Sequence, residues 1–416
     1  MSRHPSILTS LPPRHRALVI GAVGLAVVLV TALLVPRGGT PEDGALTPIT
    51  RESYAARDSA PGPGTLTAAD RAEIDRVLAG APARVGARLA PAGLAQQLMR
   101  CAEFEQQRYC LGVGWTTQEP DAARERALAT PRLAGRSAVV ETTGDLTTRD
   151  LLDQRAAMSP AELEATERAE LEEAARSVAK VVLLRHQLLG EPLPDGFLAR
   201  RPEARATTGT TTDTATSART TSTKGFKDYP RRDTVLKNKQ VRAQRRTYWC
   251  GPASMQMIAW GWQDRRRTQK HWAGRLGTTT SGSAISEMVR VVNGSTGYDN
   301  ANRAGRYIVL DISDWSYRKW MLLQLRHIHD YRAPVVLHPI LVKRFYPYLD
   351  DDASGHFQVG RGYDKNGDRP GMLGYYEPWN QQRFDPSEPY IARVQWRRAY
   401  NSFRANKAHP HQNIGV

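Results

Sequence analysis

The longest unbroken hydrophobic stretch of the chain lies near its N-terminus. Residues 17–35 form an apolar run with Thr31 as its only polar interruption. At about 1.5 Å per residue, a helix of this length nearly crosses a hydrocarbon core of about 30 Å. Three arginines and two histidines precede the run, whereas only Arg37 follows it closely. Because positive flanks stay in the cytoplasm, we predict a transmembrane signal anchor at 17–35, with residues 1–16 cytoplasmic and the bulk extracytoplasmic.

A cleaved signal peptide is the competing interpretation of this run. Its hydrophobic region is usually shorter, and a small-x-small cleavage site should follow it. Residues 35–39, Val-Pro-Arg-Gly-Gly, do not form such a site. We therefore predict a single-pass protein of the cell membrane; cleavage would instead give a secreted protein.

The hydrophobic pattern changes twice between the anchor and residue 200. Residues 36–64 are rich in Gly, Pro, Ser and charge, which predicts a tether. Residues 65–200 show helical spacing, with short strand candidates at 109–115 and 137–142. This region has no set of Cys, His and carboxylate at catalytic spacing. We interpret it as a mainly helical module, and its role as pro-segment, inhibitor or spacer stays open.

Two helices of this module have clear start and stop signals. Thr67 is predicted to cap a helix that ends at Gly80. Ser159–Glu162 is a capping box with Pro160 at the first helical position. The apolar spacing that follows predicts a long helix, which ends at Gly190.

A Thr-rich segment, 201–228, follows and is nearly free of bulky apolar residues, so it is predicted to be a flexible linker. Residues 229–400 are aromatic-rich, and helical patterns come before strand patterns, which predicts an α+β domain with an antiparallel sheet. Residues 401–416, with His409 and His411, are interpreted as a basic tail outside the fold. The predicted helices are 251–262, 285–292 and 315–329, and the predicted strands are 334–337, 340–342, 357–363 and 372–376.

The formal net charge is +16, with Lys and Arg scattered along the chain. Such a balance favours an anionic partner, for which acidic polymers of the cell envelope fit an exported protein. Nucleic acid is not expected in that compartment. A solvated basic surface without a specific partner is an equal alternative.

The chain has three cysteines. In an oxidising compartment Cys101 and Cys110, which are close in sequence, are predicted to form a disulfide. Cys250 is then an unpaired thiol in an exported protein, so it is either buried and inert or kept for its reactivity.

The surroundings of Cys250 favour reactivity. Gly251 and Pro252 fit the first turn of a helix, whose free N–H groups and dipole stabilise a thiolate. Gln244, on the incoming loop, is a candidate side-chain donor for an oxyanion, beside the Cys250 N–H. His356 begins an alternating strand and is the candidate general base.

The strand predicted at 372–376 follows the one predicted at 357–363, and a hydrogen-bond acceptor at its end would orient this histidine. The set then resembles the C39-like peptidase family of papain-like folds, over the C-terminal part of the chain only. The resemblance implies that Cys250 is the nucleophile, His356 the base and Gln244 the oxyanion donor. In that family the third catalytic residue is usually an Asp followed by Pro. The matching residue here is Glu377, whose side chain is one methylene longer, and Asn380 is the alternative. The motifs are Gln244-x5-Cys250-Gly251-Pro252-Ala253, Gly355-His356-Phe357, Gly362-Tyr363-Asp364 and Glu377-Pro378.

These features predict a membrane-anchored extracytoplasmic thiol peptidase. It would hydrolyse an amide bond of a peptide or protein through an acyl-enzyme, with no metal and no cofactor. Transpeptidase or cell-wall amidase chemistry would use the same residues. The alternative is a catalytically inactive papain-like module that binds peptides or envelope material.

Overall fold

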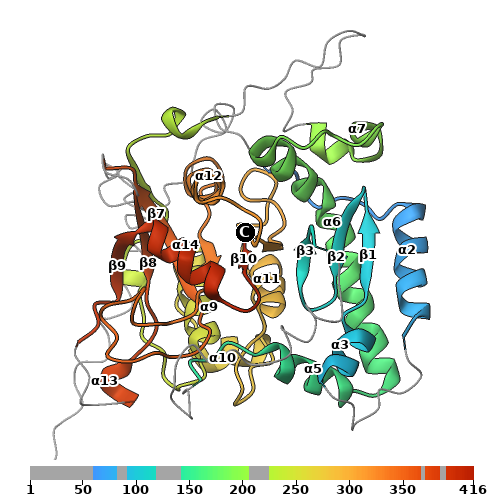
Figure 1. Cartoon of the computed structure of the whole chain (residues 1–416). Coiled ribbons are helices and arrows are strands. Elements are labelled where there is room, and N and C mark those ends of the chain that lie inside the picture. Colours follow the sequence, from blue (N-terminus) through green and yellow to red (C-terminus); the bar gives the residue numbers. More distant parts are fainter. Residues whose placement is uncertain (1–59, 82–90, 119–141, 206–223, 367–370, 385–389) are drawn as a thin grey trace, which may run out of the picture. The chain divides into compact units, whose positions relative to one another are not determined.

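The computed structural model describes residues 60–81, 91–118, 142–205, 224–366, 371–384 and 390–416 (Figure 1). These residues belong to one compact unit. The predicted anchor at 17–35 lies outside them, and so does the strand candidate at 137–142 apart from its last residue. Within the described ranges, no helix is both long enough and apolar enough to cross a membrane.

The helices fall into two groups along the chain. Short 3-10 turns lie at Pro202–Ala204, Phe226–Asp228 and Asn238–Gln240, and α12 continues into a π-helical turn, η4 (Arg326–Asp330). The first group is α2 (Ala68–Ala79), α3 (Pro91–Leu98), α5 (Thr148–Ala156), α6 (Pro160–Leu189) and α7 (Phe197–Arg200). The second is α9 (Cys250–Gln263), α10 (Gln269–Arg275), α11 (Ile285–Asn293), α12 (Tyr317–Leu325), α13 (Gln381–Phe384) and α14 (Ala399–Ala408).

The described strands form one sheet in the order β1-β2-β3-β5-β10-β6-β7-β8-β9, and β4 pairs with β7. The pair β3–β5 is parallel and the other pairs are antiparallel. The predicted class, mixed α+β with a largely antiparallel sheet, is confirmed. The strands are β1 (Cys101–Phe104), β2 (Gln107–Cys110), β3 (Gly114–Thr116), β4 (Arg232–Thr234), β5 (Val309–Asp311), β6 (Val335–Leu337), β7 (Gln358–Asp364), β8 (Met372–Tyr376), β9 (Val394–Arg398) and β10 (Asn413–Gly415).

The parts predicted as separate modules, 65–200 and 229–400, share this sheet. Strand β3 joins β5, with Trp115 opposite Leu310. Both side chains are fully buried, and one hydrophobic core contains them together with residues of α6 and α9. Helices α2 and α6 pack on β1 and β2 (Figure 1). The segment predicted as a linker, 201–228, therefore lies between two stretches of sequence that pack into one common core.

The helices with clear local signals begin and end as predicted. Thr67 caps α2, and Gly80 is its C-cap residue. Ser159 accepts a hydrogen bond from the Glu162 N–H at the start of α6, and Gly190 ends this helix at φ +79°. A positive φ is readily adopted by glycine, which has no Cβ to clash.

The predicted disulfide joins facing residues of a hairpin. Cys101 and Cys110 are partners across β1 and β2 and are bonded to each other. Cys250 is the remaining, free cysteine. The strand predicted at 340–342 is wrong, because only Ile340 makes an isolated bridge there.

The interpretation of 401–416 as a tail outside the fold is also wrong. This segment forms most of α14 and the strand β10, which pairs with β5 and β6 in the middle of the sheet. Ile414 and Val416 are fully buried, and so are His409 and His411 apart from a few per cent of their surface. A short polar stretch has no periodicity of its own, and only its pairing with β5 makes it a strand.

Candidate active site

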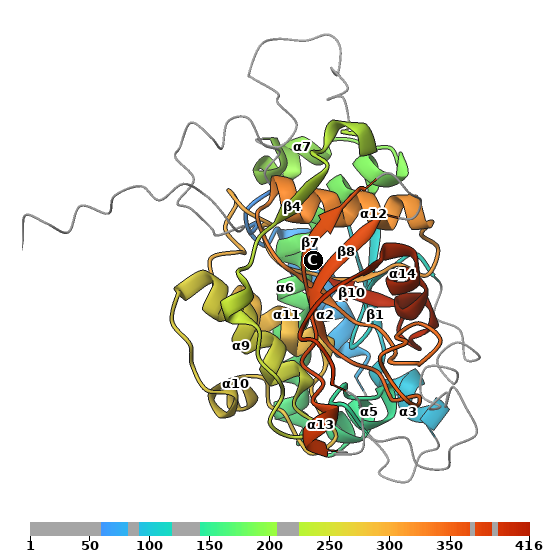
Figure 2. The same cartoon turned by 90° about the vertical axis from the view of Figure 1, so that its left-hand side faces the viewer.

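Cys250 is the first residue of α9, as predicted, and its side chain is 0 % exposed. Helix α9 packs against β7, with α10 and α11 beside it (Figure 2). Position 251 must be glycine, because a Cβ there would lie 2.7 Å from Ser283 Oγ. Pro252 fits the first turn, where its missing N–H has no intrahelical partner. Of the first N–H groups of this helix, that of Gly251 acts on the sulfur, whereas that of Cys250 donates to Thr143 O.

The surroundings of the sulfur keep the thiol neutral. Burial raises the pKa of Cys250 well above its ordinary value; two backbone N–H groups, one of them that of Phe357, lower it, while the carboxylates of Asp145 and Glu377 raise it. The Phe357 N–H belongs to the peptide bond that follows His356, so the sulfur lies beside this bond. Desolvation is the larger effect here, so the thiolate expected from the helix N-terminus is not the favoured form.

His356 immediately precedes β7 and is fully buried. Its Nε2 lies 2.8 Å from Glu377 Oε1. Its Nδ1 is buried and has no hydrogen-bond partner. An imidazole that donates from Nε2 to a carboxylate presents a lone pair at Nδ1, which is the nitrogen available to accept a proton.

The carboxylate of Glu377 is held by four donors. Oε1 also accepts the Trp379 N–H at 2.8 Å, and Oε2 accepts from Tyr348 Oη and Gln358 Nε2, both at 2.7 Å. Burial by itself would raise the pKa of Glu377, but the charge of His356 and these hydrogen bonds hold it below its ordinary value. The carboxylate is therefore ionised and fixed in orientation.

The two alternatives for the partner of the histidine differ in their contacts. Glu377 follows β8, and its N–H donates to Arg393 O at 2.8 Å, which sets the backbone so that the longer side chain reaches the imidazole. The side chain of Asn380 points elsewhere: its Oδ1 accepts from Arg393 at 3.0 Å. The structure therefore joins His356 to Glu377.

Gln244 lies close to Cys250 and to the Glu377–Pro378 turn. Its N–H donates to Pro378 O at 2.7 Å, and its side chain is 0 % exposed. Its Nε2 lies 2.6 Å from Thr247 O, 3.0 Å from Arg246 O and 3.1 Å from Thr143 O, and the Cys250 N–H donates to Thr143 O at 3.3 Å. The two predicted oxyanion donors thus converge on one carbonyl oxygen, that of Thr143.

Sequence reasoning missed Thr143. Thr143 precedes Gln244 by 101 positions, in a stretch with no motif. It directly follows the strand candidate at 137–142 of the predicted helical module. Only the fold brings it to the cysteine.

A second cluster of titratable groups lies on the same segment. Asp145 Oδ1 is 2.8 Å from His338 Nε2, and Asp145 Oδ2 is 2.8 Å from His409 Nε2. These three residues are the group, among the described residues, whose ligand atoms lie close enough to hold a metal ion. The carboxylate is already within pairing distance of both imidazoles. We therefore interpret the cluster as a buried ionic network. The sequence did not predict it, because His409 was expected to lie in a tail outside the fold.

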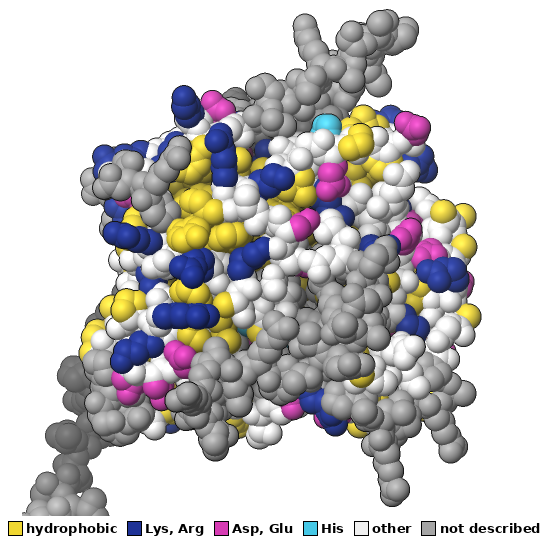
Figure 3. Space-filling model, in the orientation of Figure 1, with side chains coloured by type: hydrophobic (Ala, Val, Ile, Leu, Met, Phe, Trp, Pro, Cys, Tyr) yellow, Lys and Arg dark blue, Asp and Glu magenta, His cyan; other side chains and the backbone are white. Residues whose placement is uncertain are grey.

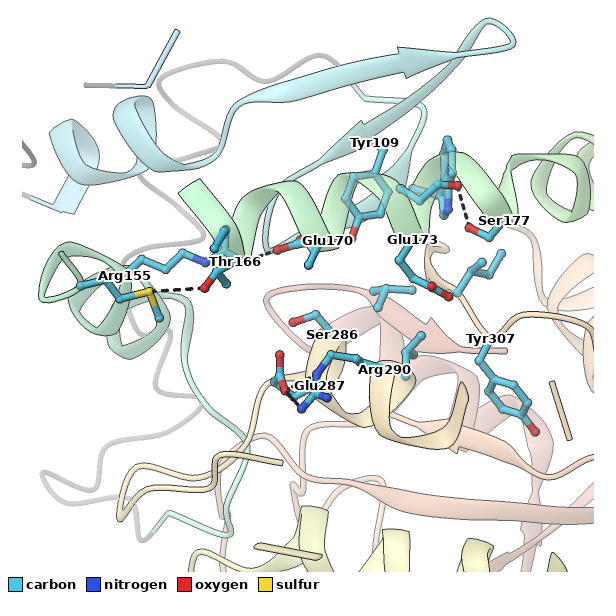
Figure 4. Close-up of a pocket in the computed structure, with 18 residues that line it drawn as sticks. Tyr109, Arg155, Thr166, Glu170, Glu173, Ser177, Ser286, Glu287, Arg290 and Tyr307 are labelled. Atoms are coloured by element: carbon cyan, nitrogen blue, oxygen red, sulfur yellow. Dashed lines mark hydrogen bonds and ion pairs between the residues drawn. The ribbon is translucent and has the colours of Figure 1, made fainter. Parts of the chain in front are cut away.

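A pocket of about 690 Å³ lies elsewhere, between α6 and α11 (Figure 4). None of the four predicted catalytic residues lines it. Its two α6 carboxylates are already paired, Glu170 with Arg155 and Glu173 with Arg306. Glu170 also accepts the Gly112 N–H at 2.7 Å. Glu170 joins elements of the first part of the chain, and Glu173 joins α6 to the segment before β5, so the pocket keeps little free chemistry.

The comparisons with known proteins agree with the resemblance seen in the sequence. Residues 236–407 match the model of the Peptidase_C39 like family. No curated protein and no solved structure matches the chain. The match includes the cysteine, histidine and glutamate described above, and Gln244. The C-terminal part of this chain, residues 236–407, is a C39-like domain of the papain-like cysteine peptidase kind.

Proposed function

We propose that this protein is an extracytoplasmic, membrane-anchored thiol peptidase that acts through Cys250, His356 and Glu377. The observation that carries the proposal is the hydrogen bond between His356 and Glu377 at 2.8 Å, which leaves His356 Nδ1 without a partner. The N–H of the next residue, Phe357, acts on the Cys250 sulfur. A buried imidazole oriented by a carboxylate is the arrangement that a thiol nucleophile requires.

In the proposed reaction, His356 Nδ1 takes the proton of the Cys250 thiol, and the sulfur attacks the carbonyl carbon of a peptide. The resulting oxyanion accepts hydrogen bonds from Gln244 Nε2 and the Cys250 N–H, which converge on one oxygen in this structure. The imidazolium returns its proton to the leaving amine, and water then hydrolyses the thioester. Glu377 stabilises the imidazolium throughout.

The test is hydrolysis of a peptide library by the purified full-length chain, followed by mass spectrometry. We expect cleavage that disappears in Cys250→Ala and in His356→Ala. His271→Ala is the matched control, since His271 is an exposed residue of α10. Hydrolysis that survives Cys250→Ala would contradict the nucleophile assignment. A protein that cleaves no peptide but retains one through His356 would instead be the inactive binding module.

We also propose that the protein binds an anionic partner. Lys and Arg side chains gather over β8, β9 and α14 on the face in Figure 3, interleaved with hydrophobic groups. Some of these cations stack on aromatic rings; the exposed Arg404, for example, lies 5.2 Å from the Phe345 ring centroid. Acidic envelope polymers fit such a face by charge. Salt-dependent binding of teichoic acid by the wild-type chain, absent in Arg398→Glu/Arg404→Glu, would support this part.

A further inference from the structure

One segment of the first half of the chain lies in the predicted active site. We call residues 142–146 the occluding segment. Its Thr143 carbonyl oxygen accepts from Gln244 Nε2 at 3.1 Å and from the Cys250 N–H at 3.3 Å. These are the two groups that would bind the carbonyl oxygen of a substrate during attack by a thiol. The segment therefore holds a peptide bond, Thr143–Gly144, where a scissile bond would lie.

The residues before His356 hold Thr143 from the other side. The Thr143 N–H donates to Ser354 Oγ at 3.0 Å, and its hydroxyl donates to Gly355 O at 2.5 Å. Thr143 is 0 % exposed. It is thus clamped between the loop that carries the cysteine and the loop that carries the histidine.

The next residue fits only as glycine. Gly144 has φ +112°, and a Cβ there would lie 2.5 Å from Tyr248 C and 3.0 Å from Cys250 N. Its carbonyl accepts the Ser283 N–H at 2.9 Å, and the Leu146 N–H donates to Ser283 O at 2.9 Å. Backbone pairing of this kind is how an extended peptide is held irrespective of its side chains.

Asp145 anchors the segment by charge. Its two oxygens lie 2.8 Å from the Nε2 atoms of His338 and His409, and all three side chains are at least nine-tenths buried. The His338 Nδ1 lies 2.6 Å from Asn413 Oδ1. Both nitrogens of His338 therefore lie close to an oxygen atom, which fixes the ring opposite the Asp145 carboxylate.

From these contacts we propose that the occluding segment is an intramolecular pseudo-substrate that closes the Cys250 site, and that the site opens only when residues 142–146 withdraw. The proposal rests on the proposed function for the identity of the site, and it adds how the site is regulated. The first half of the chain then acts as a built-in inhibitor.

The negative charge of Asp145 in the occluding segment also disfavours the Cys250 thiolate. The Asp145 carboxylate is one of the groups that raise the pKa of Cys250, after burial itself. Withdrawal of the segment would remove this charge and admit water, and both changes favour the thiolate. Occlusion and suppression of the nucleophile are therefore coupled through one residue.

The test is the rate at which iodoacetamide alkylates Cys250 in the folded full-length chain at neutral pH, read by mass spectrometry. Because Cys101 and Cys110 are bonded to each other, Cys250 is the one free thiol among the three cysteines. We expect Gly144→Ala and Asp145→Ala to raise the rate at least about tenfold over wild type. Gly274→Ala is the matched control, because a Cβ there meets nothing within 4 Å.

A synthetic peptide of residues 142–147 should slow the alkylation of Gly144→Ala, because it can refill the site. Circular dichroism shows whether each variant is folded, and Asp145→Asn replaces any variant that is not. Equal rates in wild type and folded variants would overturn the proposal. So would self-cleavage of the wild-type chain between Thr143 and Gly144, because the segment would then be consumed as a substrate.

Alkylation requires access to the sulfur but no hydrolysis, so this test separates the two proposals. Fast alkylation of Gly144→Ala without any peptide cleavage would keep the occluding segment and refute the peptidase. Peptide cleavage by wild type at the rate of Gly144→Ala, with equal alkylation, would keep the peptidase and refute the occluding segment.

Discussion

Replacing Glu377 by glutamine tests how the histidine is oriented. The amide oxygen can keep the His356 and Trp379 bonds made by Oε1. Its NH2 group then faces Tyr348 Oη, which can rotate, and Gln358 Nε2, which only donates. One buried donor therefore loses its acceptor, at a cost of about 1–3 kcal/mol. The amide also lacks the charge that stabilises an imidazolium.

We therefore expect two effects of Glu377→Gln. The free energy of unfolding should fall by about 2 kcal/mol in urea titrations. The rate of peptide hydrolysis should fall by about 10⁴, the loss that follows when the carboxylate of a catalytic triad is replaced by an amide. Rates are best measured in the Gly144→Ala background, where the site is expected to be open.

Asn380→Ala is the comparison variant, since Asn380 bonds Arg393 and not His356. It should lower hydrolysis far less than Glu377→Gln does. A Glu377→Gln protein with wild-type stability and wild-type rate would refute the orienting role. So would a larger loss in Asn380→Ala, which would make asparagine the third member.

Three further predictions concern stability. Burial first, and then the charge of His338, lowers the pKa of His409 to about 4, and burial lowers that of His411 to about 3. Below pH 6.5, the ordinary pKa, these histidines bind protons in the unfolded chain but not in the folded one. Their contribution to stability is therefore present above pH 6.5 and is lost as the pH falls toward 4. For His409 alone the loss is about 3 kcal/mol, and a urea midpoint that does not change across this pH range would contradict the prediction. Replacing both Cys101 and Cys110 by serine opens a loop with a sequence separation of 9 and should cost about 2–3 kcal/mol in chemical denaturation. Trp115→Ala should cost about 3–5 kcal/mol and destabilise the whole described core in one transition, whereas a separate, early transition of residues 65–200 would show two independent domains.

Local chemistry determined much of this protein from sequence alone. The capping boxes at Thr67 and Ser159 fix the starts of α2 and α6, because a cap depends on side chains three residues apart. The Cys250-Gly251-Pro252 start of α9 was predictable for the same reason. So were the strands that follow His356, because alternation and turn residues are also local.

The tertiary structure decided what depends on distant partners. The choice of Glu377 over Asn380 follows from the backbone bond to Arg393, which no spacing encodes. The buried strand β10 exists only through its pairing with β5, although its sequence looked like a polar tail. The hydrogen bond between Gln244 and Thr143, at the predicted oxyanion donors, joins residues 101 positions apart in the chain. Hydrogen bonds and burial at such separations are set by the packing of the whole core. The sequence therefore predicts the chemistry of the site, whereas only the fold brings Thr143 next to Cys250.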